Sequence, residues 1–163
     1  MIEAKWLFGL KPDQIDVIVH PQSIIHSIVQ FEDGAMKAQM GLPDMRLPIQ
    51  FALGYPKRMV NAYPRFDFLD YPTLQFEKVD TRVFQNLALA QSALKQGGNM
   101  PCVLNAANEV AVAAFLKENL RFIDISDVIA RCMEKVGHIS RPNLEDYLST
   151  DQETRVRALE IIG

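Results

Sequence analysis

Two of the three histidines of the chain lie six residues apart, in a segment that also carries two serines. His20 and His26 flank Ser23, and Ser27 follows, within a stretch rich in β-branched residues. A histidine titrates near neutral pH, so it can orient or protonate a substrate, and it can also bind a metal ion. The alternative is a ring that bonds to backbone carbonyls at the end of a strand. The segment 18–27 is therefore the candidate site.

The pattern around these residues limits the chemistry that they can do. Two histidines are too few for a metal site, and the third, His138, lies far along the chain in a predicted loop. Ser23 has no Gly-x-Ser-x-Gly turn around it, so a hydrogen-bonding role is favoured over a nucleophilic one.

A second polar group, Asn105, Asn108 and Glu109, falls inside a predicted helix. Asparagine is unfavourable within a helix, so some hydrogen bond is expected to compensate, and a structural network is favoured over direct catalysis. Met40 and Met45 can line an apolar face for a flat ring, or they can fill a core.

Composition excludes several classes of protein. The 163 residues suffice for one domain or two small pieces, and a net charge of −3 without a dense basic cluster argues against nucleic-acid binding. No apolar run approaches the ~20 residues of a membrane-spanning helix, and the first residues do not resemble a signal peptide. Cys102 and Cys132 have no metal-like spacing and are interpreted as buried thiols. A cytoplasmic protein with no nucleic-acid or membrane partner is expected.

The candidate site needs flanking elements to position it. Residues 2–9 predict a helix that has no capping residue before it, as if it were cut from a longer chain. The β-branched run 15–20 predicts a buried strand. Alternation over 25–31 and 36–40, around an Asp-Gly turn, predicts a β-hairpin.

The remaining chain predicts a helix, a linker and a helical half. The helix covers 43–54, with Pro48 in its first turn and Met45, Ile49, Ala52 and Leu53 facing inward. Three Tyr-Pro pairs mark 55–79 as an extended, semi-rigid linker. Four amphipathic helices are then predicted at 80–96 with Asp80 as cap, 101–118, 124–136 with Asp124 as cap, and 150–162 with a capping box at Thr150. The fold class is α+β, with a partial α/β domain containing the hairpin, followed by a four-helix bundle.

Four stretches, in order along the chain, together resemble the 1-deoxy-D-xylulose 5-phosphate reductoisomerases. They are residues 2–8 (IEAKWLF), 20–27 (HPQSIIHS), 43–46 (PDMR) and 104–110 (LNAANEV). The resemblance covers essentially the whole chain and implies an enzyme of three parts. By that resemblance, residues 1–54 are the end of the catalytic domain, 55–79 the linker and 80–163 the C-terminal helical bundle.

The resemblance also implies the reaction. Members of this family isomerise 1-deoxy-D-xylulose 5-phosphate and reduce the product with NADPH to 2-C-methyl-D-erythritol 4-phosphate, in non-mevalonate isoprenoid synthesis. A Mg²⁺ or Mn²⁺ ion acts as the Lewis acid. The dinucleotide-binding domain and the acidic metal ligands are expected upstream of residue 1, so no metal ligand is assigned in this chain.

Four residues take roles by match to the family motifs. His26 is expected on the substrate side of the pocket, with Ser23 supporting it by hydrogen bonds, and Pro43 and Met45 near the nicotinamide. Since the other parts are missing, this polypeptide alone is expected to be inactive and to bind no cofactor tightly.

Two other functional classes stay open. The hairpin can extend a sheet across a homodimer, as in the family, which makes a non-catalytic self-association or partner-binding module the main alternative. An independent metal or small-ligand binder that uses His20 and His26 is ranked third.

Overall fold

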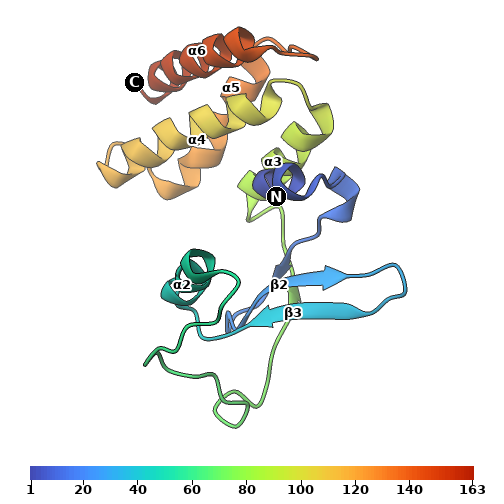
Figure 1. Cartoon of the computed structure of the whole chain (residues 1–163). Coiled ribbons are helices and arrows are strands. Elements are labelled where there is room, and N and C mark those ends of the chain that lie inside the picture. Colours follow the sequence, from blue (N-terminus) through green and yellow to red (C-terminus); the bar gives the residue numbers. More distant parts are fainter. The chain divides into compact units, whose positions relative to one another are not determined.

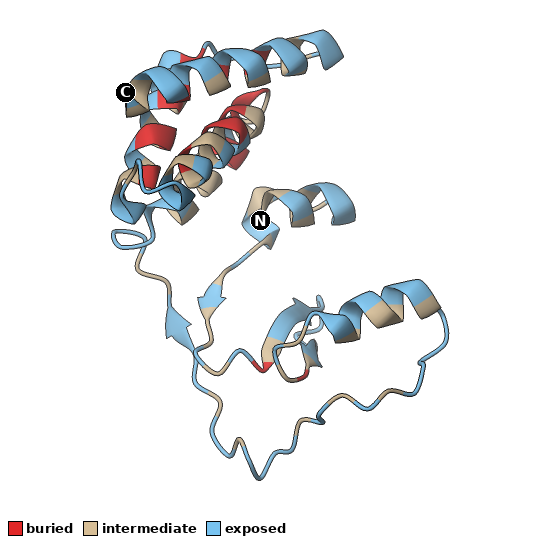
Figure 2. Cartoon of the chain, turned by 90° about the vertical axis from the view of Figure 1, so that its left-hand side faces the viewer, coloured by how far each residue is buried: buried red, intermediate tan, exposed pale blue.

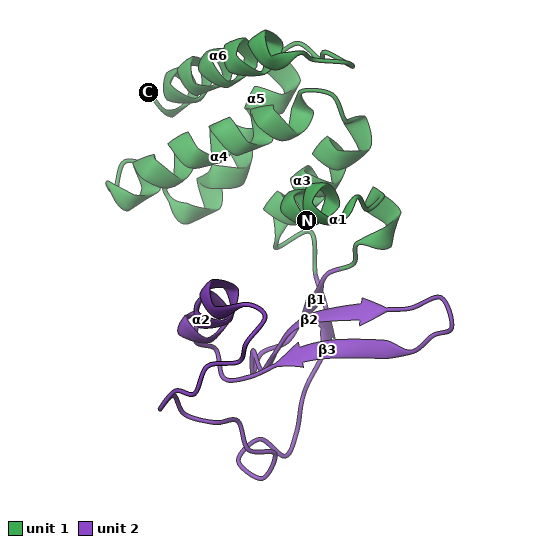
Figure 3. Ribbon diagram, in the orientation of Figure 1, with its two compact units in different colours: residues 1–16, 80–163 green, residues 17–79 purple.

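Residues 1–163 of the computed structural model form two units (Figure 3). The first unit contains residues 1–16 and 80–163, and the second contains residues 17–79. Six α-helices and two small sheets confirm the mixed α+β class. Residues 1–16 are grouped with the C-terminal helices, whereas the sequence assigns them to the end of the catalytic domain. The division at 54/55 and 79/80 stays a prediction about the intact protein.

Helices make up the first unit. They are α1 (Ile2–Phe8), the 3₁₀ turn η1 (Pro12–Gln14), α3 (Gln85–Gln96), α4 (Met100–Leu116), the 3₁₀ turn η2 (Phe122–Asp124), α5 (Ile125–Lys135) and α6 (Leu144–Ile162) (Figure 1). Helix α4 contacts α3, α5 and α6, so it is the element around which the other three pack.

The core of the first unit lies along α4 and α5, where most of the buried residues gather (Figure 2). Ala106, Ala107 and Ala111 of α4 have no exposed surface. Their small side chains let the neighbouring helices approach closely, and Ile129 and Cys132 of α5 fill the space between them.

Two helix starts differ from the sequence prediction. Helix α6 begins at Leu144, because the Asn143 side chain accepts a hydrogen bond from the backbone N–H of Asp146 in a capping box. The predicted cap at Thr150 is wrong, since that residue is buried inside the helix. Helix α3 begins at Gln85 instead of after Asp80, whose carboxylate is occupied by the backbone and guanidinium N–H groups of Arg82.

The second unit consists of two strand pairs and one helix. Strand β1 (Ile18–Val19) pairs antiparallel with β4 (Glu77–Lys78), and β2 (Ile25–Gln30) pairs antiparallel with β3 (Met36–Met40). Helix α2 (Arg46–Gly54) follows β3, with Pro48 in its first turn as the sequence predicts.

Two expectations for this unit are wrong. The run 15–20 forms no buried strand: its ladder is two residues long, because only the short β4 pairs with it, and Ile18 is 48% exposed. The predicted inner face of α2, namely Met45, Ile49, Ala52 and Leu53, is exposed instead. Amphipathic spacing identified an apolar face of α2, but nothing within the second unit covers that face.

Candidate functional site

Ser23 lies in a tight turn between β1 and β2. Its N–H donates to the carbonyl of His20 at 3.0 Å, and its φ of 51° is in the left-handed region. A non-glycine residue adopts that conformation only where the surroundings impose it. The next residue, Ile24, is fully buried and anchors the turn, and its carbonyl accepts from the N–H of Gly41 at 2.9 Å.

His26 is the extra residue of a β-bulge. Ile25 pairs with Met40, and Ser27 pairs with the adjacent residue Gln39. His26 is therefore an extra residue on β2 with no partner on β3. A bulge bends a strand and redirects a side chain, and bulges are frequent beside active sites. The imidazole of His26 is exposed, as a group that contacts a substrate must be.

Pro43 and Met45 lie in the loop that joins β3 to α2. The side chain of Asp44, between them, accepts hydrogen bonds from the backbone N–H and the guanidinium of Arg46. The Arg46 contact holds the pKa of Asp44 below its ordinary value. This ion pair fixes the loop, and Met45 is 71% exposed on it.

The structure brings these residues to one end of the β2–β3 pair. The Ser23 turn enters β2 where β3 leaves toward the Pro43–Met45 loop, and the Gly41–Ile24 hydrogen bond joins the two segments. The His26 bulge is one residue further along β2. The four residues singled out in the sequence therefore surround the same corner of the second unit.

His20 is engaged in packing contacts. Its Nδ1 lies 2.7 Å from the carbonyl oxygen of Gln75, and its ring stacks on Phe76 with centroids 4.8 Å apart. Its Nε2 is buried without a partner. These contacts agree with the alternative that the sequence offered for a histidine at a strand end, a ring bonded to a backbone carbonyl.

The polar group on α4 forms a network with α6. Asn105 donates to Glu109, and Arg155 of α6 donates to both Glu109 and Asp151 at 2.7 Å. These contacts support the structural interpretation of Asn105 and Glu109.

Sequence reasoning missed the polar centre of the first unit, Asn99. This residue is fully buried, and its side chain donates to the Gly137 carbonyl and to the Thr150 hydroxyl and accepts from the Ile139 N–H. All three partners are at least 38 residues away, so no local pattern could reveal them.

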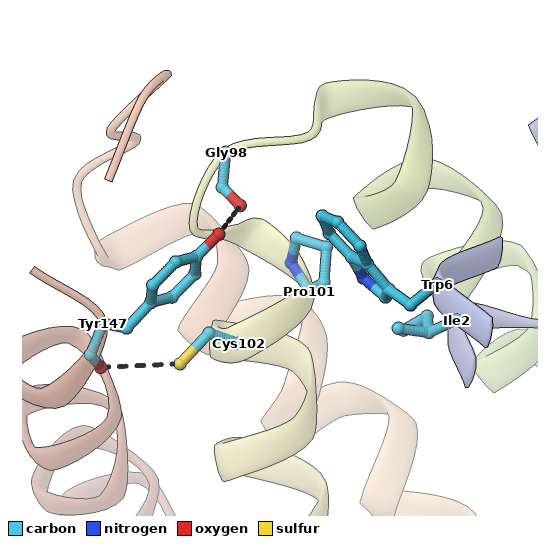
Figure 4. Close-up of a pocket in the computed structure, with 6 residues that line it drawn as sticks. All are labelled: Ile2, Trp6, Gly98, Pro101, Cys102 and Tyr147. Atoms are coloured by element: carbon cyan, nitrogen blue, oxygen red, sulfur yellow. Dashed lines mark hydrogen bonds between the residues drawn. The ribbon is translucent and has the colours of Figure 1, made fainter. Parts of the chain in front are cut away.

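A cavity of about 390 Å³ opens in the first unit, lined by Ile2, Trp6, Gly98, Pro101, Cys102 and Tyr147 (Figure 4). Almost all of its wall is apolar. The Cys102 thiol donates to the Tyr147 carbonyl, and burial raises the pKa of this thiol. A thiol kept protonated is a poor nucleophile, so Cys102 is not a candidate nucleophile in this cavity.

No group of three or more His, Cys, Asp or Glu side chains converges in the chain in a way that could hold a metal ion. None of the helices is both long enough and apolar enough to span a bilayer.

Comparison with known proteins gives the class. The family model described as the DXP reductoisomerase C-terminal domain, where DXP is 1-deoxy-D-xylulose 5-phosphate, matches residues 40–157. Since this is well over half of the chain, the chain belongs to the 1-deoxy-D-xylulose 5-phosphate reductoisomerase family.

Individual relatives agree. The reductoisomerase of Phocaeicola vulgatus is 58% identical over 163 residues, which is 100% of this chain and 43% of the relative. That of Bacteroides thetaiotaomicron is 57% identical over 162 residues, 99% of this chain and 42% of the relative. The chain thus spans less than half the length of these curated relatives.

Solved structures of the family superpose on almost the whole chain. The reductoisomerase from Zymomonas mobilis in complex with NADPH is 41% identical and covers 99% of this chain and 43% of its own, with a TM-score of 0.88. A DOX-P reductoisomerase in complex with NADPH, fosmidomycin and magnesium is 36% identical over 99% of this chain and 42% of its own, with a TM-score of 0.91.

Proposed function

We propose that this chain supplies the end of the catalytic domain, the linker and the C-terminal four-helix bundle of a 1-deoxy-D-xylulose 5-phosphate reductoisomerase. The intact enzyme isomerises 1-deoxy-D-xylulose 5-phosphate and reduces it with NADPH to 2-C-methyl-D-erythritol 4-phosphate, in non-mevalonate isoprenoid synthesis in the cytoplasm. The observation that carries the proposal is a 58% identical reductoisomerase that aligns with every residue of this chain.

In this proposal the corner of the second unit forms one wall of the substrate pocket. The bulge presents His26 to the sugar phosphate, and Ser23 supports the bound substrate by a hydrogen bond from its strained turn. The exposed apolar side chain of Met45, together with Pro43, gives a surface against which a nicotinamide ring can lie. In this proposal the residues of this chain bind the substrate and orient it against the nicotinamide. Holding the reacting groups in place lowers the activation barrier of the reaction.

The residues present do not fit a complete cofactor site. No cluster of carboxylates or histidines can hold Mg²⁺ or Mn²⁺, and no glycine-rich fingerprint for a dinucleotide occurs in the sequence. When bound in the intact enzyme, NADPH would supply the hydride and the metal would act as a Lewis acid on the substrate oxygens. Both would need binding residues from outside this chain, so we expect the 163-residue polypeptide alone to be inactive.

The test joins this chain to the preceding part of the Phocaeicola vulgatus relative. We expect the joined protein to oxidise NADPH when given 1-deoxy-D-xylulose 5-phosphate and Mg²⁺, while the 163-residue chain alone shows no turnover. In the joined protein, His26→Ala should lower kcat/KM about 100-fold, the scale expected when a group beside the reacting substrate is lost.

His138→Ala is the matched control. His138 is exposed in the loop after α5 and is not one of the residues that form the corner, so its loss should leave kcat/KM unchanged. Turnover by the chain alone would refute the claim of inactivity, and equal effects of the two histidine substitutions would refute the role of His26.

A second candidate function, self-association, has a specific observation in its favour. The β2–β3 pair is a two-stranded sheet, so both of its outer edges lack a strand partner within the chain, and Ile28, Val29, Phe31 and Met36 on it are exposed. Open edges with exposed apolar side chains favour pairing with another chain. We propose that the family enzyme uses this hairpin to form a homodimer.

A further inference from the structure

The turn that carries Ser23 is held from a part of the chain more than fifty residues away. The Gln22 amide donates to the side-chain oxygen of Gln75 at 2.9 Å, and the Gln75 backbone N–H donates to the side-chain oxygen of Gln22 at 3.1 Å. We call these two reciprocal bonds the glutamine clasp. It joins the residue directly before Ser23 to the end of the linker.

Beyond the two residue pairs of the β1–β4 ladder, side-chain hydrogen bonds join the two segments in place of backbone ones. Ile18 pairs with Lys78 and Val19 with Glu77, so His20 and Phe76 are the next facing residues, and their rings stack. Pro21 comes next, and proline has no N–H with which to extend a ladder. The Gln22 side chain instead satisfies the Gln75 N–H that would otherwise lack its strand partner.

His20 adds a third bond between the same two segments. A carbonyl oxygen can only accept a hydrogen bond, so the 2.7 Å contact with the Gln75 oxygen means that His20 donates from Nδ1. Both backbone polar groups of Gln75 are therefore taken up by side chains of the 20–22 segment.

The chain leaves the clasp directly into the strained conformation of the candidate site. Ser23 adopts its positive φ one residue after Gln22, and the His26 bulge follows three residues later. Strain of this kind persists only where neighbouring contacts impose it, and the clasp holds the residue directly before Ser23 as the buried Ile24 holds the residue directly after it.

We propose that Gln22 and Gln75 are positioning residues that hold Ser23 and His26 in place through the glutamine clasp. For catalysis this inference rests on the proposed function, but the geometric part does not. The end of the linker is then a part of the site scaffold as well as a connection.

The experiment compares Gln22→Ala and Gln30→Ala in the 163-residue chain by NMR. Gln30 is an exposed glutamine of β2 outside the clasp, so its substitution controls for the loss of a glutamine side chain. In Gln22→Ala, we expect the Ser23 amide and His26 ring signals to shift and broaden. The signals of Val29 in the hairpin and Val103 in the helical core should stay in place.

Gln22→Glu is the rescue variant. Its carboxylate still accepts from the Gln75 N–H, and the Gln75 amide can rotate to donate to the other oxygen. The Ser23 and His26 signals should therefore return close to those of the parent chain. Unchanged Ser23 and His26 signals in Gln22→Ala would overturn the proposal. A shift of the Val29 signal as large as those of Ser23 and His26 would also overturn the proposal. The clasp would then stabilise the second unit in general and would not position these two residues.

The effect of the clasp on catalysis is measured in the joined protein described under Proposed function. Gln22→Ala should raise KM for 1-deoxy-D-xylulose 5-phosphate roughly tenfold with a smaller change in kcat, and Gln22→Glu should regain most of the loss. Parent-like kinetics in Gln22→Ala would remove the catalytic part of the proposal. An inactive parent protein would instead count against the proposed function, and the NMR comparison would still decide the clasp.

Discussion

Asn99 shows how a single buried amide can join three segments of the helical unit. Its side chain bonds to Gly137 and Ile139 in the loop after α5 and to Thr150 inside α6, and its backbone N–H donates to the Ile139 carbonyl. Each of these groups would otherwise be left without a partner on burial, which costs about 1–3 kcal/mol per group. The residue before it, Gly98, must therefore let the loop approach closely.

Gly98 and Gly97 give a matched pair of substitutions at this junction. Both have positive φ, but a Cβ at Gly98 would overlap the Ile139 carbonyl, whereas a Cβ at Gly97 meets nothing within 4 Å. We expect Gly97→Ala to cost about 1–3 kcal/mol from the backbone alone, because its φ of 67° with ψ of −150° is a conformation that essentially only glycine adopts. Gly98→Ala adds the overlap with Ile139 and should cost about 4 kcal/mol or more. Urea unfolding of the helical unit, followed by circular dichroism, measures both. Equal costs for the two variants would show that the loop can move away without penalty.

At the scale of elements, α4 and α6 are joined by a charged network on top of their apolar contacts. Arg155 on α6 bonds to Glu109 on α4 and to Asp151 on its own helix. The hydrogen bonds from Arg155, and then from Asn105, hold the pKa of Glu109 below its ordinary value of 4.5. The stability that this pair contributes is therefore complete above pH 4.5 and is lost as pH falls through the lowered pKa.

Glu109→Gln tests this pH dependence, because the variant removes the titrating group and keeps the shape of the side chain. The difference in Tm between the parent chain and the variant should be present above pH 4.5 and shrink as the pH falls below that value. Glu134→Gln, at an exposed position on α5 outside this network, is the control for the loss of a glutamate. A Tm difference that does not change with pH would mean that the network acts through packing instead of charge.

At the scale of the whole molecule, the solvent-accessible surface of the chain is larger than expected for a folded protein of its mass. The chain exposes 12003 Å² at a mass of 18.5 kDa. A folded monomer of that mass exposes about 8,200 Å², and two separate domains of half the mass expose about 9,900 Å² together. Leu53 of α2 and Val29 and Met36 of the hairpin are among the exposed large apolar side chains. Surface of this kind marks places where other protein parts pack.

Self-association through the hairpin is the prediction at this scale. Val29 on β2 is 56% exposed, and Val29→Glu should weaken a dimer that pairs along the hairpin, because a charge would be buried at the interface. Val60→Glu is the control, since Val60 is 96% exposed in the linker. Light scattering after size exclusion should show a dimer for the parent chain and for Val60→Glu, and mostly monomer for Val29→Glu. A monomeric parent chain would exclude this function for the 163-residue polypeptide.

Local patterns in the sequence carried much of the fold. The apolar spacing of residues 101–118 and 124–136 corresponds to α4 and α5 within one or two residues, and Pro48 falls in the first turn of α2 as predicted. The four ordered motifs were enough to identify the family, which the family model over residues 40–157 and a relative 58% identical over the whole chain confirm. These features depend on neighbours within a few positions, which a sequence displays directly.

Long-range contacts were decided by the tertiary structure alone. Thr150, inside α6, bonds to the Asn99 side chain 51 residues away, and Gln22, directly before the Ser23 turn, bonds to a glutamine 53 residues away. The bulge at His26 depends on how β2 registers with β3, and the period of the strand does not specify it. The sequence determined most of the helices, the hairpin and the family. The structure decided which distant polar groups meet, because a hydrogen-bond partner far along the chain leaves no trace in local periodicity.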